Sequence, residues 1–179
     1  DEVETVDDRV KKVIRKLEEL LRELAKLNKD IVDDIRRRLK EVEERNRKLA
    51  EDIERLLEEG GEDTKRLLRE VEEIARRLHE ENERVLREIE KLARELHKLN
   101  EKVLRDIDRL LRELEEELRR TGVDEDVIKK VRDEAERIRR EVRRLDEESR
   151  KTVKRLLDEV RELNRRSEEE LRELRRRIE

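Results

Sequence analysis

Residues 75–92 read ARRLHEENERVLREIEKL, and residues 93–110 read ARELHKLNEKVLRDIDRL. Eleven of the eighteen aligned positions are identical, and four of the others exchange residues of like charge. Because an α-helix has 3.6 residues per turn, eighteen residues complete about five whole turns, and a straight helix then returns to the same face. The repeat therefore predicts long, uncurled helices that pack against one another in repeated layers.

The three glycines divide the chain, because they fall in two short segments, Gly60-Gly61-Glu62-Asp63 and Thr121-Gly122-Val123-Asp124. In each segment a glycine can end one helix in the left-handed conformation, and an aspartate can cap the next helix. Val123 is also placed to pack on Ile128. Since loops this short force neighbouring helices to run antiparallel, the predicted fold is all-α: an up-down-up, rod-shaped three-helix bundle of long straight helices. We expect one domain over 1–179, with helices at roughly 2–59, 63–120 and 124–179 and loops near 60–62 and 121–123.

Apolar residues form one broad stripe on each predicted helix, of a width that suits a helix facing two neighbours. Polar residues interrupt each stripe at the same eighteen-residue offset. Because the two loops fix which residues of antiparallel neighbours face each other, these polar residues fall into two predicted layers, ~27 Å apart. The first layer contains Asn28, His97, Asn100, Asp146 and Ser149, and the second contains Asn46, His79, Asn82, Asn164 and Ser167.

An asparagine in a core restricts how helices can pack, because a buried amide without a hydrogen bond costs several kcal/mol. Leucine layers pack almost equally well after a slip of one turn, whereas a paired polar layer does not. We therefore interpret the ten polar residues as a buried network that specifies conformation. The alternative is that several of them touch water at the edge of the core, first of all His79, His97, Asp146 and Asn164.

The composition excludes several classes of function. Charged residues make up 59% and apolar residues 32% of the chain, with no proline, cysteine, methionine or aromatic residue, and the net charge is −4. With neither a basic excess nor aromatic rings, nucleic acid binding is not expected. The lack of cysteine excludes disulfides and thiolate metal sites. No apolar run long enough for a membrane span and no targeting signal is visible, so we expect a soluble chain suited to recombinant cytoplasmic expression.

The search for catalytic groups is also negative. The two histidines are ~27 Å apart along the predicted helix and cannot share a metal ion or a substrate. Arg76 and Arg94 precede them by three residues, so the Glu-x-x-His motif of di-iron bundles is absent. Ser149, His97 and Asp146 are expected near one another, but no glycine-rich turn offers an oxyanion hole. We predict no enzyme activity, no cofactor, no metal and no small-molecule substrate.

The chain resembles de novo designed helical bundles with buried hydrogen-bond networks. The resemblance covers the whole chain and is carried by Leu96-His97-Lys98-Leu99-Asn100, by Leu27-Asn28, and by Ser149 and Ser167 at the eighteen-residue spacing. It implies that amides and hydroxyls of different helices hydrogen bond across the bundle. It also implies use as a monomeric scaffold, an oligomer component, a heterodimer half or a switch cage. Natural spectrin-like repeats have shorter helices and usually a core tryptophan, so we set them aside.

We predict no natural biochemical function: the chain is expected to be a designed structural scaffold whose polar layers specify register and partner choice. The alternative is a component of a designed assembly, in which the three helices accept a fourth helix or associate with copies of themselves. A pH-responsive switch, through His97 near Asp146, is a weaker alternative. Six leucines at the edges of the stripes either line a groove for a further helix or seal the core, and sealing is favoured; they are Leu20, Leu27, Leu56, Leu99, Leu111 and Leu163.

Overall fold

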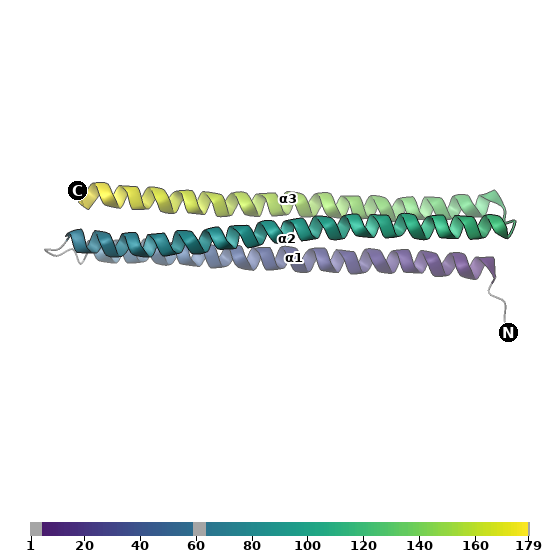
Figure 1. The fold of residues 1–179 in the computed structure, drawn as a ribbon, viewed down its shortest axis with the longest axis horizontal. Helices are drawn as coiled ribbons and strands as arrows, with labels where there is room; N and C mark the ends of the chain where they lie inside the picture. Colours follow the sequence, from purple (N-terminus) through teal and green to yellow (C-terminus); the bar gives the residue numbers. More distant parts are fainter. Residues whose placement is uncertain (1–4, 59–63, 179) are drawn as a thin grey trace. The chain divides into compact units, whose positions relative to one another are not determined.

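A computed structural model describes residues 5–58 and 64–178, which form three helices: α1 (Val6–Glu58), α2 (Thr64–Arg120) and α3 (Glu125–Ile178) (Figure 1). No strand occurs within these residues. The prediction of an all-α fold with three long helices is therefore confirmed. The predicted first loop, with its glycines and Asp63, lies outside the described residues.

The tertiary contacts divide the chain into two compact units. Unit 1 comprises Asp1–Ile31 and Arg94–Lys151, and unit 2 comprises Val32–Ala93 and Thr152–Glu179. Each unit therefore contains a segment of every helix. The single domain over 1–179 stays a prediction.

In unit 1, the side-chain pairs between helices show the direction of each segment. Within these pairs, the residue number in α1 rises as the number in α2 falls. The residue number in α3 likewise rises as the number in α2 falls, so α2 runs antiparallel to both α1 and α3. The pairs that define this order are Arg9–Glu117, Asn28–Asn100, Glu115–Arg132 and Asp108–Arg139.

Unit 2 has the same topology. Its α2 segment again runs antiparallel to the segments of α1 and α3, as shown by the pairs Arg38–Glu88, Arg45–Glu81, Glu72–Arg175 and Glu90–Arg161. Each unit is thus an antiparallel three-helix bundle, which confirms the predicted up-down-up order of the helices.

Aliphatic side chains fill the interior of both units. In unit 1 the buried cluster includes Leu17, Ile107 and Val131, and in unit 2 it includes Leu49 and Leu174. Complete burial of one such side chain contributes about 1.5–3 kcal/mol, so the stripes supply the main driving force for packing. Among the six edge leucines, Leu111 is buried, four are partly buried, and Leu27 is 44% exposed. Most of these leucines therefore seal the core, as the sequence favoured.

The loop between α2 and α3 closes through backbone hydrogen bonds that glycine permits. Gly122 has a φ of 69°, in the left-handed region that ends many helices. Its N–H donates to the Arg119 carbonyl (3.2 Å), and the Val123 N–H donates to the Leu118 carbonyl (3.3 Å), which together form a Schellman motif. Val123 packs on the cluster that contains Leu118 and Ile128, so the predicted contact of this residue with the core is present.

Thr5 caps helix α1, which begins at Val6, and the predicted start near residue 2 lies outside the described residues. The Thr5 hydroxyl oxygen accepts a hydrogen bond from the Asp8 N–H (3.2 Å), and Asp7 and Asp8 lie in the first turn, where the helix dipole favours negative charge. A threonine followed three residues later by an acidic residue is similar to a capping box. The sequence signal for this helix start is therefore Thr5 followed by Asp8, in addition to the periodic pattern of apolar residues.

We expect Gly122→Ala to destabilise the protein by about 1 kcal/mol, because an L-residue in the left-handed conformation is strained by roughly 1–2 kcal/mol. A Cβ at this position meets no atom within 4 Å, so backbone strain alone sets the loss. Guanidinium unfolding followed by circular dichroism measures it. Gly122→Asn is the matched control and should lose less, since asparagine tolerates this conformation. Equal losses for the two variants would contradict the assignment of strain.

Candidate functional site: two buried polar clusters

The first polar cluster lies in unit 1 and is named the Asn100 cluster (Asn28, His97, Asn100, Asp146 and Ser149). At its centre Asn28 and Asn100 exchange two hydrogen bonds: the Asn28 Nδ2 donates to Asn100 Oδ1 (2.8 Å), and the Asn100 Nδ2 donates to Asn28 Oδ1 (3.1 Å). Both residues are 1% exposed. The two amides therefore satisfy each other where water cannot.

Three further contacts use the remaining hydrogen-bonding capacity of this pair. The Ser149 hydroxyl donates to Asn28 Oδ1 (2.9 Å), and Asn28 Nδ2 also donates to the Leu24 carbonyl (2.8 Å). Asn100 Nδ2 donates to Asp146 Oδ1 (2.8 Å). Hydrogen bonds thus link residues of α1, α2 and α3, and no amide group of the central pair is left without a partner.

His97 lies at the edge of the cluster, with 36% of its side chain exposed. Its Nδ1 is 3.4 Å from Asp146 Oδ1, and its Nε2 is 2.9 Å from Glu101 Oε1. The Arg150 guanidinium contacts the ring nitrogens and also pairs with Asp146. Since Ser149 donates its proton to Asn28 and not to His97, these residues do not form a serine–histidine–aspartate relay.

The second cluster lies in unit 2 and is named the Asn82 cluster (Asn46, His79, Asn82, Asn164 and Ser167). Asn82 Nδ2 donates to Asn46 Oδ1 (2.9 Å) and to Asn164 Oδ1 (3.0 Å). Asn46 Nδ2 donates instead to the Leu163 carbonyl (3.1 Å). Because a carbonyl can only accept, this bond fixes the orientation of the Asn46 amide, and that in turn fixes the orientation of Asn82.

Unlike the central pair of the Asn100 cluster, the Asn82 cluster contains a buried polar atom that has no hydrogen-bond partner. Asn82 is 1% exposed, and its Oδ1 is buried without a hydrogen-bond donor. Leaving a buried acceptor unsatisfied costs about 1–3 kcal/mol. The Asn46 amide hydrogens that would satisfy it, by analogy with the Asn28–Asn100 pair, are turned toward the backbone of α3. The two clusters therefore share a residue pattern but not a hydrogen-bond pattern.

Two residues of the Asn82 cluster differ from their predicted role. His79 is 43% exposed and contacts Glu83 (3.1 Å) and Glu168 (3.7 Å), not the amides. Ser167 is half-buried, and in residues 5–58 and 64–178 its hydroxyl bonds to none of the cluster's side chains, although its counterpart Ser149 does. His79 thus lies at the water-exposed edge that the sequence analysis gives as the alternative, whereas Ser167 differs from the expected buried network.

A cavity of about 370 Å³ adjoins this open cluster and is named the Asn82 cavity. Its walls are formed mainly by α2 and α3 of unit 2, with Leu49 from α1. Sequence periodicity gives no sign of it, because a cavity depends on how side chains fill the space between helices. Its lining residues are Leu49, Glu72, Ala75, Arg76, Leu78, His79, Asn82, Asn164, Ser167, Glu168, Leu171 and Arg175.

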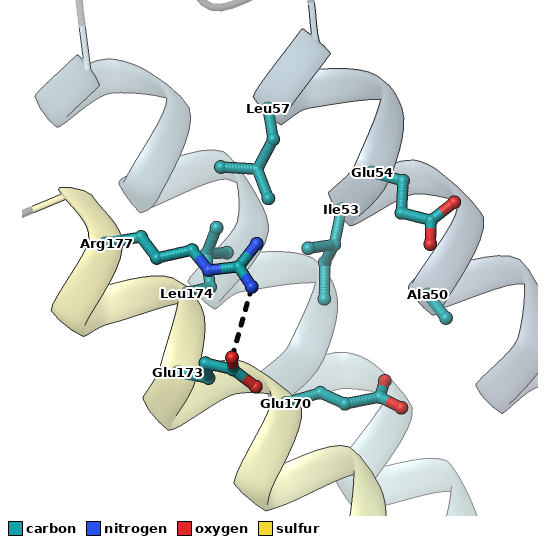
Figure 2. Close-up of a pocket in the computed structure, with 8 residues that line it drawn as sticks. All are labelled: Ala50, Ile53, Glu54, Leu57, Glu170, Glu173, Leu174 and Arg177. Carbon is teal, nitrogen blue, oxygen red and sulfur yellow. Dashed lines mark hydrogen bonds and ion pairs between the residues drawn. The ribbon is translucent and has the colours of Figure 1, made fainter.

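A smaller cavity of about 210 Å³ lies between α1 and α3 of the same unit (Figure 2). Ile53, Leu57 and Leu174 provide its apolar surface, and the remaining residues around it are mostly acidic. Figure 2 shows the Arg177 side chain extending from α3 toward Ile53, with its guanidinium held by Glu173 at 3.1 Å. None of its residues has a buried polar atom without a partner, which distinguishes it from the Asn82 cavity.

Ion pairs on the surface shift the pKa values of their partners. A hydrogen bond from Arg76 lowers the pKa of Glu73, and one from Arg165 lowers the pKa of Glu162. Such exposed pairs one turn apart contribute little to stability. Within the described residues no group of three or more histidine, aspartate and glutamate side chains is arranged to hold a metal ion. The same residues contain no helix with an apolar stretch long enough to cross a bilayer.

Comparison with solved structures gives a likeness to a three-helix protein. The chain is similar to a solved structure described as a "Computationally designed three helix bundle", with 17% sequence identity and a TM-score of 0.46, over 97% of this chain and 87% of that chain. No protein-family model matches the sequence, and no curated protein matches it.

We expect Asn100→Leu to destabilise the protein more than Asn82→Leu, by about 1 kcal/mol or more. Asn100→Leu removes three hydrogen bonds of a satisfied pair, whereas Asn82→Leu removes two and also eliminates the unsatisfied oxygen. The two positions are one repeat apart on α2, so each variant serves as the control for the other. Guanidinium unfolding compares them, and a larger loss for Asn82→Leu would refute the described difference between the clusters.

Proposed function

We propose that this protein is a de novo designed structural scaffold, in which the buried polar clusters specify the register of the helices and the choice of helical partner. The observation that carries the proposal is the reciprocal Asn28–Asn100 pair, completed by Ser149 from the third helix. An apolar layer gains similar energy in several registers, whereas this pair is satisfied in only one.

The sequence supports the same interpretation in three ways. The period of eighteen residues recurs in all three helices, the charged surface is interleaved rather than patched, and the charged residues reach 59% of the chain. Mixed charges of both signs keep a surface soluble without favouring a charged partner. These properties suit a protein whose role is to adopt one stable structure.

The experiment that tests this proposal compares Asn28→Leu, Asn100→Leu and the double variant. Each single variant leaves one amide partly unsatisfied and should lose about 1–3 kcal/mol. The double variant should match or exceed the wild-type stability, because a well-packed apolar pair replaces the polar one. The freed Ser149 hydroxyl can then bond within its own helix. Guanidinium unfolding gives the stabilities.

A separate measurement tests whether the double variant loses its single helix register. Because the chain has no cysteine, Arg9→Cys and Glu117→Cys can carry nitroxide labels at a cross-helix ion pair. We expect one narrow distance distribution in the otherwise wild-type chain and a broader or divided one in the double variant. A double variant that unfolds, or that keeps the single narrow distribution, contradicts the proposed role of the clusters.

A second candidate function is a component of a helical assembly, supported by two exposed aliphatic side chains. Leu27 is 44% exposed and Ile74 is 38% exposed, and Ile74 lies on a surface depression of about 310 Å³ between α1 and α2 of unit 2. Exposed apolar groups of this kind can be covered by a further helix or by a second copy of the chain.

Light scattering separates the two candidates. A scaffold should keep a mass near 22.1 kDa at every concentration, because its stripes cover one another. An assembly component should show a larger mass that rises with concentration and returns toward 22.1 kDa in a Leu27→Lys/Ile74→Lys variant. Lys26→Glu, beside Leu27, changes surface charge without removing an apolar group and is the control.

A further inference from the structure

We propose that the Asn82 cavity binds a small cyclic hydrocarbon, a molecule without polar groups that is held by contact with aliphatic side chains. The cavity volume of about 370 Å³ falls within the range of about 300–1,000 Å³ that small-molecule sites usually occupy. An apolar cavity of about 150 Å³ already accepts benzene. The available space therefore suits a substituted benzene.

The open space is accounted for by one departure from the eighteen-residue repeat. Because α2 and α3 run antiparallel, the step from Ala75 to Ala93 along α2 corresponds to the step from Arg175 back to Leu157 along α3. Leu157 is half-buried, whereas Arg175 is exposed and places its guanidinium 2.8 Å from Glu72. The apolar side chain available at the level of Ala93 is thus absent at the level of Ala75, and the cavity occupies that level.

The inner wall of the cavity is aliphatic. Leu49 and Ala75 are 3% and 7% exposed, and the half-buried Leu78 and Leu171 continue the same surface outward. Ordered water needs two to four polar partners, and these four side chains offer none. Water beside them is therefore easily displaced, and a hydrocarbon that takes its place removes apolar surface from water on both sides of the contact.

Asn82 also lines the cavity but offers no free polar group to a ligand. Its Nδ2 already donates to Asn46 Oδ1 and to Asn164 Oδ1, and its Oδ1 is buried. A polar group on the ligand would lose its hydrogen bonds to water and gain none from this amide. The structure therefore favours a hydrocarbon over an alcohol or an amide of the same size.

The charged residues that line the cavity exclude an ionic ligand. They lie at its mouth, since their side chains are exposed while the innermost residues are buried. Each already faces an oppositely charged or polar partner, so an ionic ligand would have to disrupt one of these contacts, and a neutral molecule does not. The contacts are Glu72–Arg175 (2.8 Å), Glu73–Arg76 (2.8 Å) and His79–Glu168 (3.7 Å).

The test titrates toluene into the wild-type protein and follows the leucine methyl resonances by NMR. The chain contains no aromatic residue, so a ring-current shift of a methyl group can come only from the probe. We expect saturable shifts at Leu49, Leu78 and Leu171, with a dissociation constant on the order of 1 mM, as the size of the ligand allows. The methyl groups of Leu17 and Leu24, in the core of unit 1, should not shift.

Benzyl alcohol is the matched probe, because it differs from toluene by one hydroxyl group. It should bind at least ~5-fold more weakly, since its hydroxyl must leave water without gaining a partner or must keep part of the ring outside the cavity. The comparison separates a site that recognises apolar surface from one that recognises a polar group.

Two variants at one exposed position locate the site. Arg175→Leu restores the residue type found one repeat earlier and should weaken toluene binding at least ~10-fold, because the leucine occupies the space that the ring needs. Arg175→Gln removes the same charge and the same ion pair without adding a branched apolar side chain, so it should bind toluene as the wild type does. Circular dichroism checks that both variants keep their helices, and the methyl shifts of the wild type depend on neither.

Four results would overturn the proposal. Absence of saturable shifts would mean that the cavity holds solvent only, and equal shifts in the core of unit 1 would mean that toluene enters the protein without a specific site. Equal or tighter binding of benzyl alcohol would mean that a polar group is recognised. Equal binding of toluene to folded Arg175→Leu would place the site elsewhere. None of these results bears on helix register, so the proposed scaffold function is tested separately.

Discussion

An amide buried among aliphatic side chains must find hydrogen-bond partners from other helices, and this requirement constrains the packing of unit 1. Asn28 and Asn100 meet it by exchanging two hydrogen bonds, and Ser149 brings the third helix into the same arrangement. Leucine and isoleucine layers supply most of the stabilising energy, yet they distinguish poorly between neighbouring registers. The polar pair contributes little net energy and much geometric selectivity, because displacing one amide leaves both unsatisfied.

The fold was largely predictable because each of its determinants is local or periodic. The eighteen-residue repeat indicated which faces are apolar, and Gly122 marked the helix end where the structure has a left-handed residue. The Thr5 cap at the start of α1 was not predicted, since the periodic sequence pattern continues on both sides of it. Division of the contacts into two units was also not predicted, because it depends on contact density rather than on periodicity.

The candidate site was predictable in most of its members but not in its bonding. The repeat correctly placed Asn28 beside Asn100, and Asn46 beside Asn82, since residue spacing determines which side chains share a level. It could not show that Asn46 turns its amide to the Leu163 carbonyl, because that choice depends on a side-chain rotamer and on a backbone atom of another helix. The unsatisfied Asn82 oxygen follows from this one rotamer.

The loop at Gly122 has a consequence for measuring backbone energetics. A Cβ atom attached there would contact nothing within 4 Å, while the hydrogen bonds on both sides hold the residue in the left-handed region. A small residue introduced at this position would therefore report its intrinsic preference for that region, without a contribution from packing at its Cβ. A set of variants at position 122 would provide an experimental scale of left-handed propensity within a folded protein.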